Sequence, residues 1–320
     1  MHSTIPAPHS NASYSIYCML CPSFHGATLF SRLLSNCDGI VALGDTLPPR
    51  IQGFVCGCGK HLEECDFWRS VEMHLSYKGQ QTLVPDLPTR IDTSGTDQPT
   101  WREHPPPQSR RFKYVVESAE QFFLVMLSML AVRCGRTIKF RRFSTSYCEF
   151  IDVCASHYDF KVFIDGFKSK TRYVVLKACG LPIRGVIHLI RDPRAYVASS
   201  KRAGISVRTA AREWVRYHTR IERLTRFTSE KVIRIRYEDL CERPHDLMDA
   251  VQCWMGDPHP QPPKSEPRKD LHWLGNSSLF DFGGHVLRHE RWREELSRVE
   301  LDIICRFALK TANRYGYPLS

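Results

Sequence analysis

Residues 185–200 constrain the fold of this chain more than any other stretch; they read Gly-Val-Ile-His-Leu-Ile-Arg-Asp-Pro-Arg-Ala-Tyr-Val-Ala-Ser-Ser. Residues 186–190 have the length and β-branched content of a strand that is buried on both faces, as in a parallel sheet. Pro193 then stands where the first turn of a helix tolerates proline, and Asp192 beside it is the expected N-cap. The stretch therefore predicts a central strand followed directly by a helix.

Arg191 ends this predicted strand, at the edge where open α/β sheets bind ligands. Ser199 lies about two turns further along the predicted helix. An arginine and a hydroxyl at such an edge can bind a phosphate group. The alternative is that Arg191 only pairs with Asp192 and caps the turn, and the pattern alone leaves both interpretations open.

Arg191-Asp-Pro-Arg, with a serine eight residues after the first arginine, resembles the 3′-phosphate-binding motif of one enzyme family. This family is the sulfotransferases that use 3′-phosphoadenosine 5′-phosphosulfate (PAPS), and the similarity is to their bacterial or tyrosylprotein-like branch. The resemblance implies that Arg191 and Ser199 hold the 3′-phosphate. Other elements of the family occur in the same order from residue 16 to residue 317.

A strand over residues 15–21, a loop of small residues and a helix beginning near residue 29 form a second predicted unit. Such a unit aims backbone N–H groups and a helix N-terminus at an anion. The loop resembles the family's 5′-phosphosulfate loop, which implies that Gly26, Ala27 and Thr28 hold that group. It lacks the Gly-Lys-Ser/Thr ending of a Walker A motif, which disfavours a magnesium-dependent nucleotide kinase.

Phe24 is a departure from the family, because the usual residue at its place in the loop is a lysine or arginine. In the family, that basic residue stabilises charge on the transferring group. In this chain His25 follows Phe24. Three consequences are open. The substitution lowers activity, moves the task to His25 or another base, or marks a binding protein that no longer catalyses.

Asp45 and Lys168 follow two further predicted strands, over residues 39–43 and 161–164. In several branches of the family, an acidic residue at the end of the first of these strands takes the proton of the acceptor. The resemblance implies this role for Asp45, and the alternative is that Asp45 caps a turn. Asp165-Gly-Phe-Lys168 resembles the family's Asp-Ser-Ser-Lys segment. It implies that Lys168 stabilises developing negative charge, the alternative being a solvated lysine at a helix start.

Tyr237 comes directly after a last predicted strand over residues 231–236, and the resemblance places it by the adenosine. His272-Trp-Leu-Gly275-Asn resembles an element near the family's cofactor lid. The family often has an arginine shortly after this element, and Arg288 is the candidate to supply its contact with the 3′-phosphate. The helix expected after Ser199 has arginines at every fourth position, which we interpret as a solvated face.

Three cysteines, Cys56, Cys58 and Cys65, lie within ten residues, with His61 nearby. Their spacing fits no standard four-ligand zinc pattern. The arrangement resembles a cysteine-rich insert of bacterial-type sulfotransferases, and we expect a substrate-side loop with a local disulfide, a metal being the lesser alternative. The other thiols are expected to be reduced, since residues 1–13 show no export signal. The apolar residues 16–20 are too short to be the core of a signal peptide or a membrane span.

The formal charge of +11 suits an anionic ligand or a polyanion. Nucleic acid is the alternative partner, although we find no zinc-finger spacing, aromatic RNA-binding motif or lysine-rich tail. Residues 1–13 are expected to be a flexible N-terminus, and the proline-rich residues 80–111 a long or disordered loop. The absence of a signal or membrane segment predicts a cytoplasmic protein.

Together these features predict one α/β domain over residues 1–320, with a parallel sheet flanked by helices and a P-loop-like sulfotransferase fold. The expected activity moves a sulfuryl group from PAPS to a hydroxyl or amine and leaves 3′-phosphoadenosine 5′-phosphate (PAP). The acceptor is a small molecule, glycan or peptide, and neither a metal, a membrane nor nucleic acid is required. The alternatives are a catalytically impaired protein that binds PAP or PAPS, and a basic nucleic-acid-binding protein.

Overall fold

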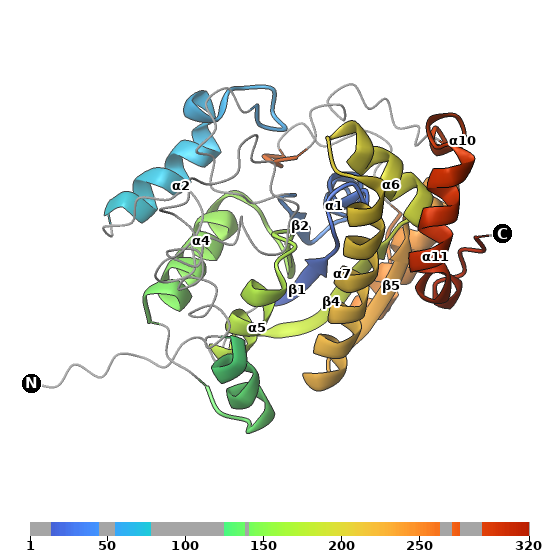
Figure 1. The fold of residues 1–320 in the computed structure, drawn as a ribbon. Helices are drawn as coiled ribbons and strands as arrows, with labels where there is room; N and C mark the ends of the chain where they lie inside the picture. Colours follow the sequence, from blue (N-terminus) through green and yellow to red (C-terminus); the bar gives the residue numbers. More distant parts are fainter. Residues whose placement is uncertain are drawn as a thin grey trace, which may run out of the picture.

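Five parallel strands form one sheet in the computed structural model, in the order β2-β3-β1-β4-β5 (Figure 1). The structure describes residues 14–44, 55–77, 125–137, 141–262, 271–275 and 290–319. The strands are β1 (Ser15–Leu20), β2 (Ile40–Ala42), β3 (Val162–Asp165), β4 (Ile183–Ile190) and β5 (Val232–Arg236). The prediction of a parallel sheet flanked by helices is confirmed.

Helices connect the strands and cover both faces of the sheet (Figure 1). They are α1 (Ala27–Ser35), α2 (Asp66–Tyr77), α4 (Arg141–His157), α5 (Lys170–Ala178), α6 (Pro193–Arg202), α7 (Val207–Phe227), α8 (Tyr237–Glu242), α9 (Pro244–Met255), α10 (Trp292–Glu295) and α11 (Arg298–Arg314). A short 3₁₀ helix, Leu62–Glu64, precedes α2. Crossover helices of this kind are what parallel strands need, because the end of one strand and the start of the next lie at opposite edges of the sheet.

The two faces of the sheet bury alternate residues of β1. Ile16, Cys18 and Leu20 pack with side chains from α2, α4, α5 and α7. Tyr17 and Met19 pack on the opposite face with α1, α8 and α9. A strand with both faces covered must be apolar throughout, which explains why β1 and β4 are nearly continuous runs of hydrophobic residues.

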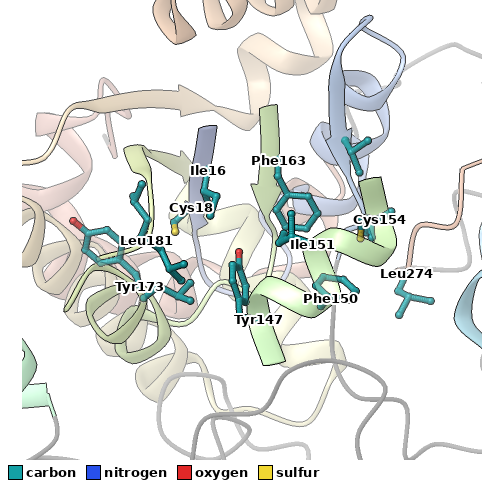
Figure 2. Packing of buried hydrophobic residues seen from close by; sticks show 14 of the residues in the cluster. Ile16, Cys18, Tyr147, Phe150, Ile151, Cys154, Phe163, Tyr173, Leu181 and Leu274 are labelled. Carbon is teal, nitrogen blue, oxygen red and sulfur yellow. The ribbon is translucent and has the colours of Figure 1, made fainter. Parts of the chain in front are cut away.

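Aromatic side chains fill the first of these cores (Figure 2). Tyr147, Phe150 and Ile151 of α4 point at the sheet, where Phe163 of β3 meets them. The rings of Phe150 and Phe163 are edge to face, with centroids 6.0 Å apart. Each fully buried apolar side chain of this size contributes about 1.5–3 kcal/mol relative to exposure, so α4 is held to the sheet mainly by this contact.

Helix α6 begins where the sequence predicts. Asp192 is its N-cap, with the side chain accepting a hydrogen bond from the Arg194 N–H at 2.7 Å, and Pro193 occupies the first turn. The next helix, α7, buries Trp214 and Tyr217 and exposes its row of arginines: Arg208, Arg212, Arg216 and Arg220. The prediction of a solvated basic face is confirmed for α7.

Residues 1–13 and the predicted loop over residues 80–111 lie outside the described residues. Within the described ranges, every helix is too short or too polar to cross a bilayer.

Candidate functional site

The carboxyl ends of the parallel strands meet at one edge of the sheet, and predicted site residues follow four adjacent strands there. Lys168 follows β3, the loop of residues 21–26 follows β1, Arg191 follows β4 and Tyr237 follows β5. Because this edge is where open α/β sheets bind ligands, the topology gathers these residues into one candidate site. Two further predicted residues, Asp45 and Arg288, lie outside the described residues.

Arg191 is fixed against the loop that follows β1. Its Nη1 donates a hydrogen bond to the Phe24 carbonyl at 2.7 Å, and its guanidinium lies 4.4 Å from the centre of the Tyr237 ring. Its Nε atom is buried and has no hydrogen-bond partner among the described residues. A buried charged N–H without an acceptor is costly, and an anionic ligand at this position would supply the acceptor.

Asp192 does not neutralise Arg191. The carboxylate instead pairs with Arg194, whose Nη2 lies 2.7 Å from Oδ2, while Arg194 Nε lies 3.1 Å from Oδ1. The alternative interpretation from the sequence, in which Arg191 only caps the turn, therefore does not describe this structure. The positive charge of Arg191 is left facing the sheet edge.

Gly26 shapes the start of α1. Its φ of 78° is left-handed, and a Cβ atom there would lie 2.4 Å from Cδ2 of Tyr237. Any other residue would therefore be strained and would collide with the tyrosine ring. Helix α1 has no side-chain cap and no acidic residue in its first turn, so the positive end of its dipole faces the site unopposed by its own side chains.

Phe24 places a half-buried ring at the position where the resemblance implies a basic side chain. The residue has a φ of 63° and its half-buried ring packs against the core of α6, α7, α10 and α11. Its carbonyl accepts the hydrogen bond from Arg191. The Phe24 position thus contributes a backbone acceptor for Arg191 and no side-chain charge.

Three buried histidines, His25, His218 and His188, form a hydrogen-bonded chain behind the loop. His25 Nε2 lies 3.1 Å from His218 Nε2, and His218 Nδ1 lies 2.8 Å from His188 Nε2. His25 Nδ1 lies 2.9 Å from the Ser23 carbonyl, to which it must donate. One arrangement of neutral tautomers then satisfies the chain, with His218 donating to His25 and His188 donating to His218.

Burial keeps these rings neutral. The pKa of His25 is lowered to about 3, mainly by removal from water and in part by the nearby charges of Arg191 and Lys168. Burial also lowers the pKa of His188 to about 3 and that of His218 well below its usual range. Both ring nitrogens of His25 are used inside the protein, so its geometry supports a role in holding the loop rather than in contacting a ligand.

Lys168 is presented by a turn that Asp165 organises. Asp165 accepts hydrogen bonds from the Phe167 N–H at 3.1 Å, from Tyr147 Oη at 3.0 Å and from Arg172 Nε at 3.1 Å. Lys168 has a φ of 65°, and its carbonyl accepts a hydrogen bond from Tyr217 Oη. Lys168 therefore lies in a buried, fixed turn at the strand end, unlike a solvated lysine at a helix start.

The remaining predicted residues are buried near the same loops. Ser199 lies on α6, where its hydroxyl accepts a hydrogen bond from Arg202 Nη2 at 3.0 Å. Ala27 and Thr28 form the first turn of α1. A Cβ atom on Gly275 would lie 2.3 Å from Cγ2 of Thr28, so the segment 271–275 closes directly over this turn.

A small pocket opens beside Arg191. It is lined by Arg191, Asp192, Ala195, Tyr237, Glu238, Glu290 and Trp292. Glu238 is itself fixed, because it accepts hydrogen bonds from the Asp192 N–H at 3.1 Å and from Tyr317 Oη. The carboxylates of this pocket suit a partner that donates hydrogen bonds, such as an amine or a sugar hydroxyl, next to a cation that suits a phosphate.

Several of these residues have no counterpart among the sequence predictions. His188, His218 and Glu238 were not expected at the site. A histidine in the middle of a buried strand is a signal that could have found His188, since a buried imidazole needs a partner. No spacing in the chain relates it to His218 or His25.

The expected local disulfide among Cys56, Cys58 and Cys65 is wrong. All thirteen cysteines are described and all are free thiols, with the Sγ atoms of Cys58 and Cys65 3.7 Å apart. A disulfide requires about 2.05 Å.

No protein-family model matches this chain, and no curated protein matches it. Among solved structures, the sulfotransferase domain from the Synechococcus PCC 7002 olefin synthase is similar at 15% identity and a TM-score of 0.48, covering 98% of each chain. The sulfotransferase domain from the curacin biosynthetic pathway is similar at 16% identity and a TM-score of 0.43, over 96% of this chain and 99% of that one. Sulfotransferase STF9 from Mycobacterium avium is similar at 12% identity and a TM-score of 0.45, over 96% of this chain and 78% of that one. At identities and TM-scores this low, the likenesses support no argument about function.

Proposed function

We propose that this chain is a sulfotransferase that uses PAPS as the donor and transfers its sulfuryl group to a hydroxyl or amine. One observation carries the proposal. Adjacent parallel strands bring Lys168, the N-terminus of α1, Arg191 and Tyr237 to one sheet edge, and the buried Nε of Arg191 lacks an acceptor among the residues described there. A ligand with an anionic group at each end of a nucleoside suits this arrangement.

In this proposal, different residues bind the two ends of the nucleotide. Arg191, Ser199 and Tyr237 would bind the nucleotide and its 3′-phosphate, with Arg288 as a further candidate. Gly26, Ala27 and Thr28 would hold the 5′ end through the start of α1. PAPS would supply an activated sulfuryl group, and the chain's share of catalysis would be positioning and electrostatics, as in phosphoryl transfer.

One side chain would stabilise the developing negative charge, and another would accept the proton of the acceptor. Lys168, fixed by the turn at Asp165, would stabilise negative charge on the leaving side. Asp45 would accept the proton of the acceptor, which is a hydroxyl or amine on a small molecule, glycan or peptide. His25 would act as a positioning residue, because both of its ring nitrogens bind within the protein.

A second candidate function is binding of PAP or PAPS without transfer. The observation that favours it is Phe24, whose ring packs into the core at the position where the resemblance places a basic side chain. In that case the nucleotide would bind normally at Arg191, and sulfated product would not appear. Transfer and binding must therefore be measured separately.

We expect calorimetric titration to show micromolar binding of PAP by the wild-type protein, and much weaker binding of AMP, which lacks the 3′-phosphate. Arg191→Ala should raise the Kd for PAP by at least about 100-fold, because it removes a buried charge-assisted contact with a dianion. The control is Arg208→Ala, which removes an exposed arginine on α7 and should leave the Kd unchanged.

Incubation with sulfur-labelled PAPS and a panel of hydroxyl and amine acceptors then separates the two candidates. Labelled acceptor supports transfer, whereas tight PAP binding without any labelled product supports the binding protein. A well-folded wild type that does not bind PAP would contradict both.

A further inference from the structure

Three cysteines and one histidine from opposite ends of the chain come together beside α2. The Sγ atoms of Cys56, Cys58 and Cys65 and a ring nitrogen of His272 all lie within 4.8 Å of one another. His272 Nδ1 is 3.1 Å from Cys65 Sγ and 3.5 Å from Cys56 Sγ. Cys58 Sγ is 3.7 Å from Cys65 Sγ.

Two of these distances match the edges of a tetrahedron around zinc, and the third is shorter. Zinc–sulfur bonds of about 2.3 Å and zinc–nitrogen bonds of about 2.0–2.1 Å place tetrahedral ligand atoms about 3.5–3.8 Å apart. The 3.5 Å and 3.7 Å contacts lie in this range, the 3.1 Å contact lies below it, and the other three pairs of ligand atoms lie within 4.8 Å. The Sγ atoms of Cys58 and Cys65 are too far apart for a disulfide. A set of three thiolates and one imidazole binds zinc in preference to magnesium or calcium.

We infer that Cys56, Cys58, Cys65 and His272 form a structural zinc site with three thiolate ligands and one imidazole ligand. This site goes beyond the proposed function, and it does not depend on PAPS or on any residue of the candidate active site. With four protein ligands it would be closed, as structural zinc sites are, and would leave no position for a substrate.

The backbone around Cys56 and Cys58 holds the two sulfurs on one side of a tight turn. Cys56 donates from its N–H to the Lys60 carbonyl at 2.9 Å, and Gly59 donates back to the Cys56 carbonyl at 2.8 Å. Gly59 has a φ of 84°, which the reversal of the chain requires. This turn explains how a Cys-x-Cys pair, rather than the usual Cys-x-x-Cys, can point two ligands at one ion.

Cys65 and His272 are positioned by their neighbours. Cys65 directly precedes α2, whose N-terminal dipole stabilises a thiolate. The His272 ring stacks on Phe67 with centroids 4.9 Å apart and planes 6° apart. The backbone N–H of His272 donates to the hydroxyl of Tyr158 at 3.2 Å. The stacking on Phe67 fixes the plane of the ring and the hydrogen bond to Tyr158 fixes the backbone of His272, and Nδ1 lies towards the sulfurs.

The zinc would fasten the segment 271–275 to the region before α2. The same segment pairs with the end of β2, where the Leu274 N–H donates to the Leu43 carbonyl at 2.8 Å. Its Gly275 touches Thr28 at the start of α1. In Figure 1 this segment lies between α2 and α1. The ion would therefore hold a strap across the edge of the sheet at which the candidate site lies.

Metal analysis of protein purified without chelator tests the inference. We expect about one zinc ion per chain in the wild type, as a four-ligand site requires. After exchange with cobalt, thiolate-to-cobalt charge-transfer absorption should appear. Cys65→Ser and His272→Ala should each reduce bound zinc at least about 10-fold, because each removes a direct ligand and even the loss of an outer-shell partner costs about 10–100-fold in metal affinity.

Two matched variants control for misfolding. His61→Ala removes the exposed histidine next to the same turn and should keep its zinc. His272→Cys replaces one ligand by another, and should keep the zinc while the cobalt spectrum gains the intensity of a fourth thiolate. A folded wild type that lacks metal and takes up neither zinc nor cobalt would overturn the inference. So would normal zinc content in both Cys65→Ser and His272→Ala, or a Cys58–Cys65 disulfide found by mass spectrometry.

Discussion

The wild-type protein should lose a large part of its free energy of unfolding between pH 7 and pH 5, because His25, His188 and His218 are buried as neutral rings. The pKa of His25 and of His188 is about 3 in the folded state, against an ordinary value near 6.5 when the chain is unfolded. Between these values only the unfolded chain binds the protons. Stability therefore rises with pH in this window and is lost as the pH falls below about 6.5.

The size of this loss follows from proton linkage. Each histidine with such a shift costs about 2 kcal/mol of stability on going from pH 7 to pH 5, with a limiting slope of about 1.4 kcal/mol per pH unit. The losses from His25 and His188 together come to about 4 kcal/mol, close to the lower end of the stability of an ordinary domain, which is about 5–15 kcal/mol, and the lowered pKa of His218 acts in the same direction. Urea denaturation at a series of pH values measures the slope directly.

His218→Gln is the informative variant for this prediction. Glutamine can still donate to His25 and accept from His188, but it cannot titrate, so the slope should fall by about one proton. His245→Gln, at an exposed position on α9, should leave the slope as in the wild type. If the free energy of unfolding is flat between pH 7 and pH 5, the histidine chain is not buried and neutral.

Asp165→Ala should destabilise the fold by about 3–5 kcal/mol, because it removes the carboxylate that pairs with the buried guanidinium of Arg172. Arg172 is only 2% exposed and its Nε donates to Asp165. The substitution also removes the acceptor of the Tyr147 hydroxyl and of the Phe167 N–H. The turn that presents Lys168 would lose its organising side chain at the same time. Urea denaturation at pH 7 measures the loss.

A double variant that removes both charges distinguishes the effect of the broken ion pair from the effect of the lost side-chain volume. Asp165→Ala with Arg172→Met should recover part of the lost stability, because the buried charge that lost its Asp165 partner is also removed. Asp152→Ala, at an exposed position on α4, should change the free energy of unfolding by less than about 0.5 kcal/mol. A double variant no more stable than Asp165→Ala alone would show that the pair is not the cause.

The sheet and its helices could be predicted because their signals are local. Apolar runs mark β1, β4 and β5 to within a few residues, and Asp192-Pro193 marks the start of α6. Parallel strands have their carboxyl ends at one edge of the sheet, so the gathering of Lys168, Arg191 and Tyr237 at one edge could be expected as well, whereas the order of the strands could not. Whether these residues bind PAPS stays a prediction.

The contacts between distant parts of the chain could not be predicted. His272 contacts Cys65 although the two residues are 207 positions apart in the sequence, so no short sequence motif could describe the cluster. His61 is the histidine adjacent to the cysteines in sequence, whereas the structure brings His272 to them. In the same way, His25 is a candidate in the sequence because of its place in a loop, although its partner His218 lies 193 positions away and both of its ring nitrogens bind inside the protein.

The position of β1 has a consequence for how the protein is made. This strand is synthesised before every other strand of the sheet, yet it is the middle strand and pairs only with β3 and β4 among the described residues. At about 5–20 residues per second, roughly 7–30 seconds separate its synthesis from that of its first partner. Throughout this time both backbone edges of β1 lack the strands with which they pair in the described sheet, so a chaperone that shields extended apolar segments should determine how much chain reaches the native state.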